Sequence, residues 1–179
     1  MGATNNDFID CLKNRVAKLA IGASTLRNQG AGGVVAAARR GLNRIDLPTF
    51  AVSNEAAFIG RLDAVTGALQ SKFPKGGRSW GGARKAVNIF LRDVVYSTDL
   101  SDHFDLHGIR AWLEVPLDSQ IAKALRAERE GAGLPRWPRI KHLRPEISAL
   151  YQRVASKVAK RQGIKRVDLD VFYWRAEPV

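Results

Sequence analysis

Apolar residues recur at helical spacing along most of this chain, and this periodicity limits the possible folds more than any other feature. Ile9, Leu12, Val16 and Leu19 form one such stripe, because residues three and four apart share a helix face. Comparable patterns predict helices at about 7–19, 34–42, 53–72, 83–94, 118–125 and 146–161. Only 167–174 alternates as a strand would, and it stays open between a strand and a last short helix. The expected fold class is all-α.

The length allows one compact domain. With 179 residues, of which 45% are apolar, the chain can bury a substantial core,. We expect a single helical domain over 1–179, with two lobes possible.

The charge favours a polyanionic partner. Lys and Arg outnumber Asp and Glu by 29 to 17, which gives a formal charge of +12 and a pI near 10.4. Between 123 and 166, thirteen cations face only three acidic residues. Nucleic acid is the first partner that this predicts, and an anionic membrane surface is the second. The plainer alternative for the basic stretch is a solvated helix face.

Cysteine content and the N-terminus bear on the compartment. Cys11 is the only cysteine, so a disulfide within the chain and an iron–sulfur cluster held by four cysteines are both excluded,. The sequence shows no signal peptide and no apolar run of the ~20 residues needed to span a bilayer. We expect a cytoplasmic, nucleoid-associated monomer without cofactor or metal.

The segment Gly81-Gly82-Ala83-Arg84 predicts a small-residue turn after a loop at 75–82. Such a turn lets backbone N–H groups at a helix N-terminus approach a phosphate closely. Lys85 is expected in the first turn of the following helix. The alternative is an ordinary glycine-bearing loop before a helix.

A second motif is Val115-Pro116-Leu117-Asp118, in which Asp118 is placed to cap the next helix,. In this order the two motifs resemble those of the helix-hairpin-helix DNA glycosylases, particularly the endonuclease III branch. The resemblance covers about 79–126. Lys85 and Asp118 are 33 positions apart, a spacing similar to that of the archaeal-type 8-oxoguanine glycosylases. Ala83 and Gln120 depart from the family pattern, which usually has glycine and histidine there.

The resemblance implies a two-lobed helix-hairpin-helix glycosylase fold and an N-glycosylase with abasic-site lyase activity. Such an enzyme flips a base out of double-stranded DNA. Lys85 would attack the sugar C1′ as a neutral amine, and Asp118 would orient it and stabilise positive charge on the sugar. The implied DNA contacts are Gly81, Gly82, Ala83, Arg84, Lys123 and Arg126. The implied base pocket consists of Gln29, Asp170 and Trp174.

Several alternatives stay open. The first expected substrate is 8-oxoguanine, but the same scaffold could excise another modified base, such as modified cytosine in phage DNA. A non-catalytic helix-hairpin-helix protein would use the same basic surface for attachment only. In that case Lys85 would be a phosphate-contacting or solvated lysine, and Asp118 a simple helix cap.

Overall fold

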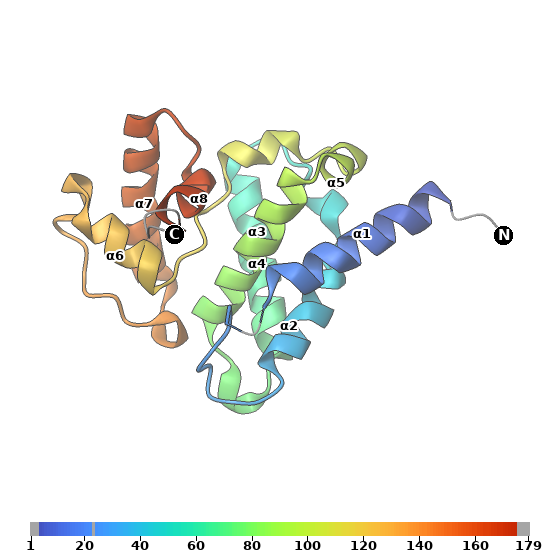
Figure 1. The fold of residues 1–179 in the computed structure, drawn as a ribbon, viewed down its shortest axis with the longest axis horizontal. Coiled ribbons are helices and arrows are strands. Elements are labelled where there is room, and N and C mark those ends of the chain that lie inside the picture. Colours follow the sequence, from blue (N-terminus) through green and yellow to red (C-terminus); the bar gives the residue numbers. More distant parts are fainter. Residues whose placement is uncertain (1–3, 23, 175–179) are drawn as a thin grey trace.

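The computed structural model describes residues 4–22 and 24–174, and Figure 1 shows a chain of helices joined by turns and longer loops. The α-helices are α1 Asn5–Ala20, α2 Val34–Asn43, α3 Glu55–Lys72, α4 Trp80–Tyr96, α5 Thr98–His103, α6 Ser119–Ala127, α7 Pro145–Gln162 and α8 Leu169–Trp174. The 3₁₀ turns are η1 Leu47–Phe50, η2 Lys75–Gly77, η3 His107–Ala111, η4 Arg129–Gly131, η5 Ile140–His142 and η6 Arg166–Asp168. The all-α class is confirmed, with no strand in the described residues, and the undecided tail is η6 followed by α8.

Side-chain caps explain where several helices begin. The Thr4 side chain accepts a hydrogen bond from the Asp7 amide, and the Thr4 amide donates one to the Asp7 carboxylate, so α1 starts with a capping box,. Asn54 caps α3, one residue after the expected Ser53. Asp118 caps α6 as predicted. These donors would otherwise lack a partner at each helix N-terminus.

The buried apolar residues form two clusters. The first lobe contains α1 to α5 with η1 to η3, and its core includes Phe50, Phe58 and Phe90. The second lobe contains α6, α7 and α8, with Tyr151 at its centre. Figure 1 shows the second lobe on the left, beside α4 of the first. No helix in the described part of the chain has a stretch long and apolar enough to cross a bilayer.

Helix α4 is the central element. Twelve of its 17 residues are buried, because α1, α2, α3 and α5 pack around it and α7 and η5 reach it from the second lobe. The helical spacing of the sequence places Lys85, Asn88 and Arg92 together on the polar side of this helix, and packing covers that side as well. Asn88 is buried, and the other two side chains are largely covered.

The apolar stripe of α1 is also corrected in part. Leu19 was expected inside but is 71% exposed, whereas Ala17 and Ala20 are buried. The buried face of α1 is thus rotated toward two small residues, since α1 packs closely against α2 and α4.

Candidate active site between the lobes

A cleft of about 1180 Å³ lies between the two lobes. Its walls come from α4, the segment at 24–28, the start of α6, the segment at 137–142 and α8. It exceeds the ~300–1,000 Å³ of pockets that enclose a small ligand. Both Lys85 and Asp118 line it.

Lys85 and Asp118 meet in this cleft. Lys85 lies in the second turn of α4, not in the first as expected, because α4 begins at Trp80. Its Nζ donates a hydrogen bond of 3.1 Å to Asp118 Oδ2. The exposed fractions of the two side chains are 12% and 18%, so the pair is largely screened from water but accessible from the cleft.

The two oxygens of Asp118 have different partners. Oδ1 accepts hydrogen bonds from the amides of Gln120 and Ile121, each at 2.9 Å. Oδ2 is thereby directed toward Lys85. The backbone donors and the dipole of α6 stabilise negative charge on this carboxylate. Asp118 therefore acts as a helix cap and as a possible proton acceptor at the same time.

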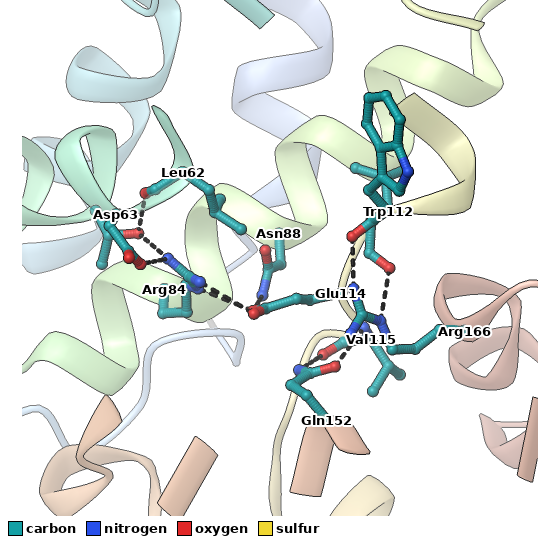
Figure 2. Close-up of polar contacts among 11 residues, drawn as sticks. Leu62, Asp63, Arg84, Asn88, Trp112, Glu114, Val115, Gln152 and Arg166 are labelled. Atoms are coloured by element: carbon teal, nitrogen blue, oxygen red, sulfur yellow. Dashed lines mark hydrogen bonds and ion pairs between the residues drawn. The ribbon is translucent and has the colours of Figure 1, made fainter. Parts of the chain in front are cut away.

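A buried polar network, shown in Figure 2, holds the connection between the lobes on its first-lobe side. Arg84 donates to both oxygens of Glu114, at 2.8 and 3.0 Å, and Asn88 donates to Glu114 Oε2 at 2.9 Å. Burial alone would raise the pKa of Glu114, but the hydrogen bonds and charge of Arg84 outweigh it, so this pKa is lowered,. Arg84 also pairs with Asp63 of α3 at 2.7 Å.

The second lobe holds the same connection from its other side (Figure 2). Gln152 of α7 exchanges two hydrogen bonds with the backbone of Val115. Arg166 donates to the carbonyl oxygens of Trp112 and Leu113. Side chains of both lobes thus fix the segment that leads to Asp118, which keeps the carboxylate at its distance from Lys85.

Asp170 lies in the same cleft, as one of the expected base-pocket residues. Arg92 forms an ion pair with it and another with Asp93, the latter at 2.7 Å. Burial raises the pKa of Asp170 to about 6; the charge of Arg92 opposes this shift and the nearby Asp118 adds to it,. A carboxyl group that changes charge near neutral pH therefore faces the Lys85–Asp118 pair.

The expected turn at Gly81-Gly82-Ala83-Arg84 is wrong. These four residues are buried within the first turns of α4. A Cβ at Gly81 would lie 2.3 Å from the carbonyl oxygen of Ile140, so this glycine admits η5 against the helix. The Gly82 amide donates to Ser79 Oγ, and Arg84 is bound to carboxylates. These residues present no surface to a phosphate.

The actual turn between α3 and α4 lies earlier, at 73–79, and includes η2. Lys75, Gly76 and Arg78 are exposed there. The Pro74 ring and two glycines ended the preceding helix as expected, but Ser79 restarts the next one by capping the amide of Gly82,. A serine before an aromatic residue was the available signal for this earlier helix start.

Gln29 and Trp174 are not shown in the cleft. Gln29 is buried and accepts a hydrogen bond of 2.5 Å from Ser79, which ties the segment before α2 to the start of α4. Its neighbours Arg27 and Asn28 line the cleft instead. Trp174 is the last residue of α8, and its side chain lies outside the described part of the chain.

The basic stretch is mostly on the surface. Lys123 and Arg126 are exposed on α6, and Arg139 and Lys141 line the cleft. Arg166 is the exception, because its guanidinium supports the connection between the lobes. Among the described residues, only Arg129 and Arg161 of this stretch form ion pairs.

Sequence reasoning missed Arg92 and Glu114. Arg92 stands two turns after Lys85 on α4, and a seven-residue spacing along a helix was the available signal,. Glu114 carries no local signal, since its partner Arg84 is 30 positions away.

The described residues contain no group of His, Cys, Asp and Glu side chains arranged to hold a metal ion. Comparison with family models, with curated proteins and with solved structures finds no match to this chain.

Proposed function

We propose that this protein is a DNA N-glycosylase with abasic-site lyase activity, with a fold of the helix-hairpin-helix glycosylase type. The observation that carries the proposal is the contact of 3.1 Å between Lys85 Nζ and Asp118 Oδ2, in a cleft large enough for a nucleotide. An amine with an adjacent carboxylate is the pair that attack on a sugar C1′ requires.

The surface around the cleft supports DNA as the partner. Arg27, Arg139 and Lys141 are exposed at its walls, and Lys123 and Arg126 extend the positive charge along α6. Extruding a nucleotide requires a few kcal/mol, which contacts between these cations and the phosphates would offset.

The proposed chemistry follows from the pair. Asp118 Oδ2 takes a proton from the Lys85 ammonium, and the neutral amine attacks C1′ of the flipped nucleotide. The bond between C1′ and the base breaks, and the base leaves with the electron pair and is protonated by water. The aminium nitrogen of Lys85 loses a proton to water, its lone pair opens the C1′–O4′ bond, and O4′ takes up the proton held by Asp118, which leaves a protonated Schiff base. Loss of a C2′ proton from this imine breaks the C3′–O bond, which is the lyase step.

The buried segment Gly81–Arg84 of α4 takes no part in the DNA contacts that we propose. Contacts to phosphate are assigned instead to the exposed turn at 73–79, where Lys75 and Arg78 are available. The first substrate that we propose is 8-oxoguanine. The alternative is another modified base, such as modified cytosine in phage DNA, which Asp170 would read from the same cleft.

The test is borohydride trapping on duplexes that carry oxidised, alkylated, deaminated or modified bases. Reduction of the imine should leave a covalent complex on the duplexes that are cleaved. Lys85→Gln should lose this adduct and keep most DNA affinity. Lys157→Gln is the matched control, because Lys157 is exposed on α7 and does not line the cleft, so it should leave trapping intact.

The possible results separate the candidate functions. An adduct that persists in Lys85→Gln would place the nucleophile elsewhere. Excision without any adduct would make the enzyme a glycosylase that activates water. DNA binding without excision of any base on the panel would favour the non-catalytic alternative.

A further inference from the structure

A second groove, of about 560 Å³, lies between α2 and α3 in the first lobe. It shares no lining residue with the cleft of the candidate active site. Its apolar lining, called the floor below, consists of Ala37, Ile45, Ala64, Val65, Ala68 and Leu69, of which Ala64 and Ala68 are exposed. The floor of such a groove favours a ligand that has an apolar face of its own.

The rim of this groove is strongly basic. Arg40, Arg44, Arg61 and Lys72 line it together with a single carboxylate, that of Asp46. None of the four cations forms an ion pair with any described residue. Four cations around one carboxylate create a positive field over an apolar floor.

Arg61 is a rim cation with one nitrogen that lacks an acceptor in the described part of the chain. Its guanidinium lies 5.8 Å from the centre of the Phe50 ring, which holds the side chain at the groove. Its Nε is buried and has no hydrogen-bond partner among the described residues. Arg61 also forms no ion pair with a described residue, so a carboxylate of a ligand at its outer guanidinium nitrogens would neutralise its charge.

We propose that this groove binds an acidic amphipathic segment of a partner protein. Apolar side chains of the segment would cover Val65 and Leu69, and its carboxylates would pair with Arg40, Arg44 and Arg61. Duplex DNA fits less well, because its backbone offers no apolar face to the floor. A nucleotide fits less well too, because no aromatic residue lines the groove for a base to stack on,.

The test uses a defined probe and fluorescence anisotropy. The probe is a labelled helical peptide of about 15 residues, with leucine along one face and glutamate elsewhere. One control peptide has serine in place of leucine, and the other has glutamine in place of glutamate. Saturable binding of the probe, weakened about tenfold or more in either control, is expected.

Variants locate the binding site. Arg44→Glu reverses a rim charge, and Ala68→Glu introduces a carboxylate on the exposed side of α3. Each should weaken probe binding about tenfold or more, by like-charge repulsion. Lys157→Glu on α7 is the matched control, an exposed charge reversal outside the groove, and should change binding by less than about twofold.

Three results would overturn the proposal. The first is no saturable binding at probe concentrations up to about 1 mM. The second is equal weakening by Lys157→Glu, which would indicate general attraction to a basic protein. The third is loss of duplex DNA affinity in both Arg44→Glu and Ala68→Glu as large as the loss of probe affinity, which would assign the groove to a DNA interface. Because Ala68→Glu leaves the rim cations intact, the test still decides if Arg44→Glu fails to fold.

Discussion

The Lys85 amine and the Asp118 carboxylate, 33 positions apart in sequence, lie 3.1 Å from each other across the boundary between the two lobes. One comes from the second turn of α4 and the other from the N-cap of α6. A movement of the lobes away from each other would separate them, so the network around Glu114, which holds the connection between the lobes, helps to maintain this contact.

Asp118→Asn tests the carboxylate without removing the cap, since asparagine caps helices about as well as aspartate. We expect base release to fall about 10²–10⁴-fold, because the proton acceptor and its charge are lost. DNA affinity should stay similar or rise. Single-turnover excision and a binding titration measure the two effects. Normal excision by a folded Asp118→Asn protein would remove Asp118 from the mechanism.

Affinity for duplex DNA should fall steeply with salt, because bound cations displace counterions from the phosphates. Arg139→Glu and Lys141→Glu at the cleft wall should each lower affinity and flatten the salt dependence. Lys160→Glu, near the C-terminal end of α7 and outside the cleft lining, should lower affinity less. Equal effects at all three positions, or affinity that does not change with salt, would argue against DNA binding centred on the cleft.

Gly81→Ala and Gly67→Ala should have opposite effects on stability. A Cβ at Gly81 would meet Ile140 O at 2.3 Å and Leu143 Cβ at 2.7 Å, whereas nothing lies within 4 Å of one at Gly67. We expect Gly81→Ala to destabilise the fold by about 1–3 kcal/mol. Gly67→Ala, on the exposed side of α3, should stabilise it by about 0.5–1 kcal/mol. Urea unfolding measures both, and a stabilising Gly81→Ala would contradict the packing of η5 on α4.

Glu114→Ala should be strongly destabilising. It would leave Arg84 buried with only the more exposed Asp63 as a carboxylate partner, a loss of about 3–5 kcal/mol. The double variant Arg84→Met, Glu114→Leu should lie closer to the original protein, because the one carboxylate that then loses its partner is the exposed Asp63. Urea unfolding of this double variant and of its two single variants, Arg84→Met and Glu114→Leu, completes a double-mutant cycle and gives the coupling energy of the pair. Additive effects of the two single changes would show that the pair is not coupled.

The raised pKa of Asp170 should make the free energy of unfolding depend on pH,. Its pKa is raised from 3.8 to about 6 by burial, so between these values the folded protein keeps a proton that the unfolded chain releases. The free energy of unfolding therefore decreases as pH rises above 3.8, and this loss is complete above about pH 6, where the buried carboxyl is ionised in the folded protein as well,. Asp170→Asn should therefore gain stability, relative to the original protein, as pH rises from about 4 to 7. Asp99→Asn, at an exposed position on α5, is the control, and a pH-independent difference for Asp170→Asn would contradict the shift.

Local sequence determined most of the helices and the place of Asp118 at the start of α6. Apolar periodicity and caps act over a few residues, so the all-α class and the capping role of Asp118 could be predicted directly. The family resemblance pairs Lys85 with Asp118, and the structure brings their side chains into contact.

Tertiary packing decided what local pattern could not. Whether Gly81 and Gly82 form a turn or a buried helix start depends on η5, which approaches from 140–142. The burial of Arg84 depends on Glu114, 30 positions away, and the shifted pKa of Asp170 depends on how α8 closes against α4. The close approach of two backbones and the removal of water from a charged group both require that distant segments of the chain meet. The local spacing of residues therefore cannot predict them.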